Sequence, residues 1–386
     1  MSQQILVISP GGEIIRALCE TLRSGGFLLF TSSTLVRPST QEHRPALCII
    51  DLHFSREDRG QWEEWLQDCQ SAHTACLAFD SSEQVDHNAI ACLEPLCDVL
   101  VDPENPGLLT GKVHSLLTIR KLTRQLDATR HQLSRYQLEL QDALHSAAHI
   151  QRSLIPTRLP NCGKLSYSWQ YLPCKQVGGD LFNIVQLDEQ TVMAYLMDVS
   201  GHGISSAMVT VSVHQSLSLN TGQLVKKPTE YPPYYAITPP RQVLKALETE
   251  YPFERFEEFF TISYLLINPY TGQLRYSNGG HPPPFLLRNN GSVERLDAGG
   301  TLIGVGKLVD FEEGGTSLKA GDRIFLYTDG ITEHQDAGGA VYGETRFCEQ
   351  LLALKEKPLE DMTRDTLIAL REFGGSSLPI DDVTLI

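Results

Sequence analysis

Short apolar runs alternate with amphipathic stretches over residues 1–112. Continuous apolar runs separated by helical windows are typical of parallel strands that are buried on both faces and joined by helices. The expected strands are 5–8, 27–30, 47–50, 75–78 and 99–101, and the expected helices include 13–24 and 60–69. This part of the chain is therefore predicted to form an α/β domain with a parallel sheet.

A heptad pattern follows this region. The first core positions are Ile119, Leu126, Leu133, Leu140, Ala147 and Leu154, and the second are Leu122, Thr129, Tyr136, Ala143 and Ile150. No Pro or Gly interrupts the pattern, and Pro156 ends it. Such a seam favours a two-stranded coiled coil. Residues 113–156 are thus predicted to be a helical linker that pairs two chains in a parallel homodimer. One long helix lying along its own domains is the alternative.

Residues 157–386 have a different pattern. Short β-rich runs such as 192–197 and 323–327 recur, with helical windows at 204–219 and 241–251 between them. Runs of strands with few helices predict an α+β domain with packed sheets. The chain is therefore expected to have three parts, with boundaries at 1–112, 113–156 and 157–386.

Composition narrows the class of protein. With 386 residues, of which 41% are hydrophobic, the chain can form real cores, so a disordered protein is excluded. Acidic residues outnumber basic ones by 47 to 32, and nucleic-acid binders usually carry a basic surface, so no nucleic-acid partner is expected. No signal-like start and no apolar run near the ~20 residues of a membrane span is visible, so a cytoplasmic protein is expected.

The cysteines agree with that compartment. They are Cys19, Cys48, Cys69, Cys76, Cys92, Cys97, Cys162, Cys174 and Cys348. Their number is odd, no two pairs have zinc-site spacing, and several lie inside apolar runs. They are interpreted as free thiols of a reducing compartment.

Four aspartates stand at turns and strand ends in the C-terminal part. They are Asp180 after two glycines, Asp198 in DVSGHG, Asp329 in TDG and Asp381 in DDVT. Glycines beside an acid allow sharp turns, and converging acids repel one another unless cations neutralise them. One Asp-Gly pair alone is usually a turn signal. Four such motifs together predict an all-oxygen site that suits Mg²⁺ or Mn²⁺ rather than zinc.

The N-terminal pattern resembles a response-regulator receiver domain. Asp51 follows the third expected strand, where that family carries its phospho-acceptor. Ser9-Pro10 replaces the family's pair of acids, Ala78-Phe79 replaces the hydroxyl residue of the fourth strand, and Asp102 replaces the lysine. Phosphorylation of an aspartate needs a hard cation and a positive charge. We therefore expect a degenerate receiver that is not phosphorylated, in which Asp51 is a strand-end residue.

The order of the motifs GGD, DVSGHG, TDG and DDVT resembles the bacterial regulatory branch of the PPM-type metal-dependent Ser/Thr protein phosphatases, related to the sporulation stage II E phosphatase. Four further stretches fit the same family, at 150–156, 260–263, 276–283 and 299–305. The resemblance covers about 150–386 and implies a β-sandwich flanked by helices.

The resemblance also implies a site and a chemistry. Two divalent cations, Mn²⁺ or Mg²⁺, about 3.5–4 Å apart would lower the pKa of a shared water that attacks phosphoserine or phosphothreonine. The implied ligands are Asp180, Asp198, the carbonyl of Val199, Asp329 and Asp381. Asp180 and Asp198 are the expected catalytic residues, Asp198 as the bridge, and Asp382 is the disfavoured neighbour of Asp381.

Three further residues have a less defined role. His202 lies four residues after Asp198, so it is either a general acid or a loop-stabilising residue. Lys175, just before the glycines, is a candidate phosphate-binding residue. His281 is expected to be structural.

The predicted function is that of a metal-dependent Ser/Thr protein phosphatase in bacterial signalling. By resemblance, its substrate is an anti-sigma-factor antagonist of a partner-switching pathway. The alternative is a non-catalytic adaptor whose two domains bind a sigma factor or its regulator, and a small-molecule phosphoesterase comes third. Retention of all four acids favours the enzyme.

Overall fold

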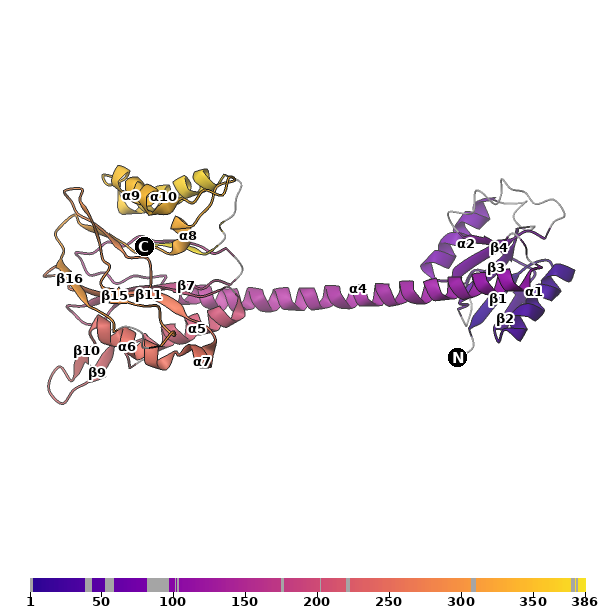
Figure 1. Cartoon of the computed structure of the whole chain (residues 1–386), viewed down its shortest axis with the longest axis horizontal. Helices are drawn as coiled ribbons and strands as arrows, with labels where there is room; N and C mark the ends of the chain where they lie inside the picture. The colour runs from indigo at the N-terminus through magenta and orange to yellow at the C-terminus, as the bar shows by residue number, and fades with distance from the viewer. Residues whose placement is uncertain are drawn as a thin grey trace. The chain divides into compact units, whose positions relative to one another are not determined.

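The structure is a computed structural model of the chain (Figure 1). It describes residues 3–38, 44–52, 59–81, 97–100, 102, 104–174, 177–201, 203–219, 223–306, 310–375, 379 and 381–386. The chain forms two compact units, Met1–Leu138 and Glu139–Ile386.

A parallel sheet of five strands forms the centre of the N-terminal unit. The strands are β1 (Gln4–Ile8), β2 (Leu28–Ser32), β3 (Leu47–Asp51), β4 (Ala75–Phe79) and β5 (Asp98–Leu100). Their order is β2-β1-β3-β4-β5, and every neighbouring pair is parallel. This is a doubly wound order that several α/β folds share. The predicted α/β domain with a parallel sheet is confirmed.

Helices cover both faces of this sheet because its strands are apolar on both sides. Along β1, Ile5 and Val7 face one core with α1 (Glu13–Ser24) and the first turns of α4 (Pro106–Leu154). Leu6 and Ile8 face a second core with α2 (Arg59–Ser71).

The helix α4 includes most of the predicted linker and begins at Pro106, earlier than expected. Proline suits the first turn of a helix, and the Asn105 side chain accepts hydrogen bonds from the first free N–H groups. Its first turns pack into the N-terminal core through Leu109, Val113 and Leu117. The apolar side chains exposed farther along are Ile119, Leu122, Leu126, Leu133, Tyr136, Leu138, Leu140 and Ile150. The predicted seam is thus largely exposed, whereas two of its last three positions, Ala147 and Leu154, pack within the C-terminal unit.

Three sheets, arranged in two layers, form the centre of the C-terminal unit. The largest has the order β15-β12-β11-β8-β7, with β16 also paired to β12, and the two smaller sheets have the orders β14-β13-β17 and β18-β6. A bridge between Tyr327 and Leu385 joins the two smaller sheets into one layer. The strands of the largest sheet are β7 (Asp180–Gln186), β8 (Val192–Val199), β11 (Phe260–Ile267), β12 (Gln273–Gly279), β15 (Gly299–Gly300) and β16 (Gly314–Ser317). Those of the second layer are β6 (Gln170–Leu172), β13 (Phe285–Leu287), β14 (Val293–Arg295), β17 (Arg323–Phe325) and β18 (Val383–Leu385).

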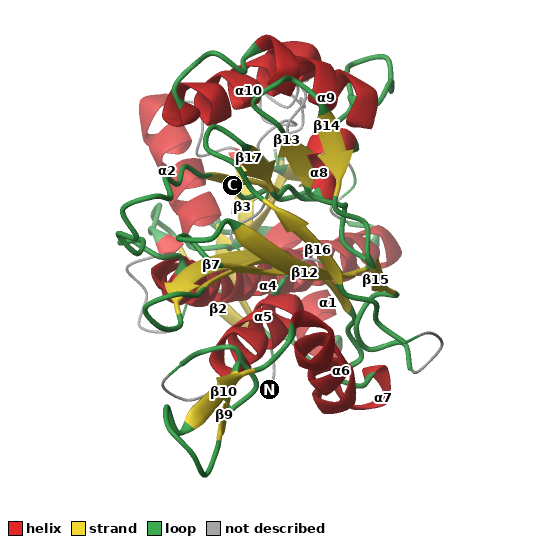
Figure 2. Ribbon diagram, turned by 90° about the vertical axis from the view of Figure 1, so that its left-hand side faces the viewer, coloured by secondary structure: helices red, strands yellow, loops and turns green. Residues whose placement is uncertain are grey.

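The sheets pack face to face between two layers of helices. On β8, Ala194 and Leu196 point into the core between the sheets, and Met193 and Met197 point toward α5 and α6. The second layer packs its outer face on α9 and α10. Figure 2 shows α9 and α10 on one side of the sheets and α5 and α6 on the other. The predicted β-sandwich flanked by helices is confirmed.

Six helices and a small hairpin complete this unit. They are α5 (Ile204–Ser216), α6 (Pro240–Glu250), α7 (Phe253–Phe256), α8 (Asp329–Thr332), α9 (Gly343–Ala353) and α10 (Leu359–Gly374), with the hairpin β9 (Lys226–Pro228) and β10 (Tyr235–Ile237). In the described part of the chain, no helix combines the length and apolar composition that a membrane crossing needs. None of the eight described cysteines is in a disulfide, and Cys92 lies outside the described residues.

Candidate metal centre

The four aspartates expected as metal ligands come together in the C-terminal unit. Asp180 is the first residue of β7 and is paired in register with Asp198 near the end of β8, because these strands are antiparallel neighbours. Asp329 begins α8, directly after the second layer, and Asp381 precedes β18. Carboxylates from both layers therefore meet at one end of the sandwich.

Burial and mutual repulsion disfavour negative charge in this cluster. Burial raises the pKa of Asp198 to about 8, and the nearby Asp329 and Asp381 add to the rise. Burial, together with the charge of Asp198, also raises the pKa of Asp180. A hydrogen bond between these two carboxyls acts in the opposite direction on Asp198.

Two glycines let the turn before β7 approach the end of β8. A Cβ atom on Gly179 would lie 2.4 Å from the carbonyl oxygen of Val199 and 3.0 Å from Oδ1 of Asp198. A Cβ atom on Gly178 would lie 1.9 Å from Oδ2 of Asp382. Neither position can hold a side chain without displacing the acids. The expected ligand carbonyl of Val199 thus lies directly beside this turn.

Asp382 holds the same turn in place. Its side chain is 2% exposed, and it accepts hydrogen bonds from the backbone N–H groups of Cys174 (2.8 Å), Gly179 (2.8 Å) and Asp180 (3.4 Å). Hydrogen bonds from three backbone N–H groups hold this carboxylate in a fixed position. Sequence reasoning missed this role, although the neighbouring acids in DDVT were a visible signal.

Two hydroxyl groups orient Asp180. Its Oδ2 accepts hydrogen bonds from Thr328, at 3.0 Å, and from Thr384. Both threonines are fully buried and belong to the motifs TDG and DDVT. Sequence reasoning singled out only the acids of these motifs.

Asp329 supplies an oxygen that suits a cation. Its Oδ1 is buried and has no hydrogen-bond partner among the described residues. Burial, with the charges of Glu333 and Asp381, raises its pKa to about 6. Such an orphaned carboxylate oxygen among other carboxylates fits a hard divalent cation.

Asp381 is exposed beside this group. It accepts a hydrogen bond of 2.8 Å from the N–H of Asp382. One ligand atom each of Cys174, Asp381 and Asp382 lies within 4.8 Å of the others.

These raised pKa values predict a pH-dependent stability without metal. Between pH about 4 and about 8, folded Asp198 keeps a proton that the unfolded chain has lost, and Asp329 does so up to about pH 6. The free energy of unfolding should therefore fall as pH rises through this range and level off above it. Mn²⁺ should reverse the fall, because cations bind ionised carboxylates.

Thermal unfolding in a chelator, and then with Mn²⁺, across this pH range checks the prediction. Asp198→Asn should make the unfolding temperature in chelator less dependent on pH, whereas Asp297→Asn, at an exposed position, should leave the pH dependence unchanged. An unfolding temperature in chelator that rises from pH 4 to 8 would contradict the prediction.

The end of α4 holds the first glycine of the turn. The side-chain amide of Gln151 donates to the carbonyl of Gly178 (2.7 Å) and accepts from its N–H (3.1 Å). Nearby, Ala148 packs with Val177 and with Ala207 of α5. Gln151 is 4% exposed and was not identified from the sequence, because a glutamine in a helix carries no signal of so distant a partner.

Of the three remaining candidate site residues, the structure describes only His281. Lys175 and His202 lie outside the described residues. His281 is 3% exposed, and burial lowers its pKa to about 3. Its Nδ1 pairs with the hydroxyl of Thr261 at 2.7 Å, and Thr261 lies opposite Asp198 in the sheet. A buried neutral imidazole in this position agrees with the expected structural role.

Asp51 of the N-terminal unit is surrounded by hydroxyl groups. It ends β3 and is fully buried. Its Oδ2 accepts hydrogen bonds from Ser9 (3.0 Å) and Ser81 (2.7 Å). As expected, β4 runs through Ala78-Phe79 and does not end in a hydroxyl residue, but Ser81, two residues after the strand, supplies a hydroxyl to Asp51.

The family of the C-terminal unit follows from comparison with known proteins. The model of the stage II sporulation protein E (SpoIIE) family matches residues 188–386, which is just over half of the chain. The chain belongs to the SpoIIE family. The predicted family is thereby confirmed, and the SpoIIE match includes Asp198, Asp329 and Asp381.

Two proteins of Bacillus subtilis (strain 168) are similar in sequence. Phosphoserine phosphatase RsbU is 27% identical over 255 residues, covering 65% of this chain and 70% of RsbU. Phosphoserine phosphatase RsbP is 28% identical over 203 residues, covering 51% of this chain and 47% of RsbP. The chain thus spans about half of the length of RsbP. Among solved structures, the SiaA-PP2C domain of Pseudomonas aeruginosa has a TM-score of 0.52, is 19% identical and covers 65% of this chain and 96% of that domain. It supports the PP2C-type fold.

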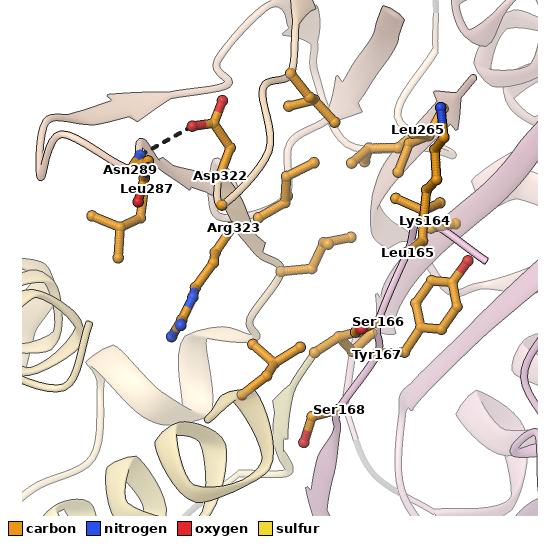
Figure 3. A pocket seen from close by; sticks show the side chains of 18 of the residues that line it. Lys164, Leu165, Ser166, Tyr167, Ser168, Leu265, Leu287, Asn289, Asp322 and Arg323 are labelled. Atoms are coloured by element: carbon orange, nitrogen blue, oxygen red, sulfur yellow. Dashed lines mark hydrogen bonds between the residues drawn. The ribbon is translucent and has the colours of Figure 1, made fainter. Parts of the chain in front are cut away.

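A cavity of about 500 Å³ in the SpoIIE-type unit lies apart from the acids (Figure 3). Its walls include Ile184 of β7 and Ala194 of β8, each four residues from the aspartate of its strand. Figure 3 shows Arg323 and Asp322 beside this cavity, where the carboxylate of Asp322 accepts a hydrogen bond from the backbone N–H of Asn289. None of the four ligand candidates lines this cavity, so it does not belong to the metal centre.

Proposed function

We propose that the chain is a metal-dependent phosphatase that hydrolyses phosphoserine or phosphothreonine in a regulatory protein. The observation that carries this proposal is the cluster of four carboxylates with the orphaned Oδ1 of Asp329. The SpoIIE family match and the names of RsbU and RsbP, both phosphoserine phosphatases, support it.

The proposed metal ligands come from several elements of the C-terminal unit. They are Asp180, Asp198, the Val199 carbonyl, Asp329 and Asp381. When bound, two Mn²⁺ or Mg²⁺ ions would supply an activated water and neutralise charge on the phosphoryl group. Asp198 would be the shared ligand, because it lies between Asp180 and the acids of the second layer. The N–H donors to Asp382 support Asp381 as the ligand of the pair.

Other residues of the chain would hold the metal ligands in position. Thr328 and Thr384 fix the carboxyl of Asp180, and Asp382 and Gln151 fix the glycine turn before it. A fixed ligand set keeps the reacting groups in place without reorganisation during the reaction.

The proposed substrate is a phosphorylated anti-sigma-factor antagonist of a partner-switching pathway. The similarity to RsbU and RsbP supports this choice. The proposed location is the cytoplasm, which the free thiols support. The alternative, a non-catalytic adaptor for a sigma factor or its regulator, is disfavoured by the retained acids.

Release of phosphate from such a phosphorylated antagonist tests the proposal. With Mn²⁺, the full chain should release phosphate from the phosphoserine protein, and a chelator should stop the reaction. Binding of the antagonist without any release, in Mn²⁺ and in Mg²⁺, would favour the adaptor. Release from small aryl phosphates alone would favour a small-molecule phosphoesterase.

We further propose that residues 1–112 are a degenerate receiver domain, that 113–156 connect it to a phosphatase domain at 157–386, and that the linker forms a homodimer. The strand order β2-β1-β3-β4-β5 and the position of Asp51 at the end of β3 support the receiver. The exposed apolar side chains of α4 support the dimer.

The receiver should not take up phosphate. Asp51 accepts hydrogen bonds from the neutral hydroxyls of Ser9 and Ser81, and Ser9-Pro10 holds no carboxylate that could bind a cation. With acetyl phosphate and Mg²⁺, intact mass should therefore stay unchanged, and Asp51→Ala should leave phosphatase activity unaltered. A gain of one phosphoryl group that Asp51→Ala removes would contradict this.

A further inference from the structure

Three cysteines form a row across neighbouring strands of the N-terminal unit. Cys48 on β3 and Cys76 on β4 are paired in the parallel ladder, and both side chains belong to the core that α2 covers. Asp98 on β5 pairs with Leu77. This register places Cys97, one residue before Asp98, beside Cys76. The three side chains therefore share one face of the sheet.

A fourth thiol lies beside this row. Cys69, on α2, packs in the same core, and Cys69, Cys76 and Cys97 line one cavity. Exposure increases along the row. Cys48 is 0% exposed and Cys69 1%, Cys76 is 6% exposed, and Cys97 is half-buried. Solvent therefore reaches the row through Cys97.

The surroundings of Cys97 favour its thiolate. The hydrogen bond from Cys76 lowers the pKa of Cys97, while burial and the charge of Asp98 act against it. Lys112 forms an ion pair with Asp98 and offsets part of that charge. Cys76, Cys97, Lys112 and Arg120 all line one cavity of about 880 Å³, which gives a small reagent access.

We propose that Cys97 and Cys76 form a peroxide-reactive dithiol that closes to a disulfide. In the first step the Cys97 thiolate attacks an oxygen of hydrogen peroxide, the O–O bond breaks, and a sulfenic acid forms as hydroxide leaves. In the second step the Cys76 sulfur attacks the sulfenic sulfur, the S–O bond breaks, and the Cys76 proton leaves with the oxygen as water. The two sulfurs lose two electrons, and the peroxide is reduced to one water and one hydroxide, which becomes a second water when it takes up the proton that Cys97 released on forming the thiolate.

The backbone allows this bond. If the register of β4 and β5 continues by one residue, the Cα atoms of Cys76 and Cys97 lie about 4.7–4.9 Å apart, within the Cα separation of about 4.4–6.8 Å that a disulfide spans. Cys97 stands in a bend before β5, outside the ladder, so its backbone can adjust. Among the described residues, no three of these thiols lie within 4.8 Å of one another, so the row suits a pairwise bond better than a metal ion.

Peptide mapping of the full chain tests the proposal. The protein is treated with hydrogen peroxide, free thiols are alkylated, and the chain is digested with chymotrypsin. Cleavage after Leu96 separates Cys97 from Cys92, and fragmentation of the cross-linked peptide distinguishes Cys76 from Cys69. The expected product is a Cys76–Cys97 cross-link within one chain that dithiothreitol removes.

Three cysteine variants test which thiols form the cross-link. Cys97→Ser should reduce the cross-link to the level of untreated protein. Cys69→Ser should retain it, as should Cys162→Ser, which changes a half-buried cysteine of the other unit. The proposal is overturned by a cross-link that joins other cysteines, by one that joins two chains, or by Cys97 oxidised to sulfinic acid without a cross-link. The map of the wild-type protein decides among these outcomes even if a variant fails to fold.

Discussion

Asp198→Ala is expected to abolish the metal-dependent release of phosphate while the fold persists. Asp198 lies beside Asp180 on the neighbouring strand, and its pKa responds to Asp329 and Asp381 of the second layer. It is the one carboxyl that we assign to both cations. Its loss should lower hydrolysis of an aryl phosphate in Mn²⁺ by about 10²-fold or more.

Asp297→Ala is the matched control for this substitution. Asp297 is exposed between β14 and β15 and should keep the wild-type rate. Without metal, Asp198→Ala should unfold at the wild-type temperature or above it, because one carboxylate leaves a repelling cluster. It should also lose the stabilisation that Mn²⁺ gives the wild type. Wild-type turnover in Asp198→Ala would show that the ligand assignment is wrong.

The acids of the metal centre could be predicted from the sequence, but the residues that hold them could not. Gly-Asp and Asp-Gly motifs at the ends of apolar runs are local signals. The pairing of Asp180 with Asp198 depends on the order of the strands in the sheet. The contacts of Asp382 with the glycine turn and of Gln151 with Gly178 join residues far apart in the chain. No local pattern indicates such partners.

In the N-terminal unit, too, the features with a local sequence signal could be predicted and the contacts between distant residues could not. Its strands were predictable because a parallel strand buried on both faces is a continuous apolar run. The hydroxyl of Ser81 beside Asp51 was missed because Ser81 lies beyond the end of β4. The cysteines likewise read as separate core residues, and only the register of β3, β4 and β5 makes them a row.

The heptad pattern predicted a long helix correctly, but one pattern serves different contacts along α4. Ala147 and Leu154 of the pattern pack in the C-terminal unit, whereas Val113 and Leu117, which precede the pattern, pack in the N-terminal core. Side chains between them, such as Leu133 and Leu140, are exposed. Spacing alone could not distinguish positions that a helix buries in its own chain from those that it offers to a second copy.

Replacing both Leu133 and Leu140 with Asp is expected to convert a dimer into monomers. Each leucine is 56% exposed on α4, and we place both in the seam between two chains. An uncompensated charge buried in an apolar seam costs about 3–5 kcal/mol, and each chain would bury two. Light scattering measures the mass. Ser134→Asp with Gln141→Asp is the matched control, because it adds the same charges at the same spacing on positions outside the seam. A wild-type monomer would contradict the pairing.

Assembly should also change the phosphatase rate, because the same helix ends at the metal centre. Gln151 on α4 makes two hydrogen bonds to Gly178, and Asp180 follows two residues later. A rotation of the paired helices would move Gln151 and, through Gly178, the turn that places Asp180. The double substitution L133D/L140D should therefore alter turnover in Mn²⁺, and Gln151→Ala should lower turnover without changing the mass. If L133D/L140D is monomeric but keeps the wild-type rate, α4 does not transmit assembly to the site.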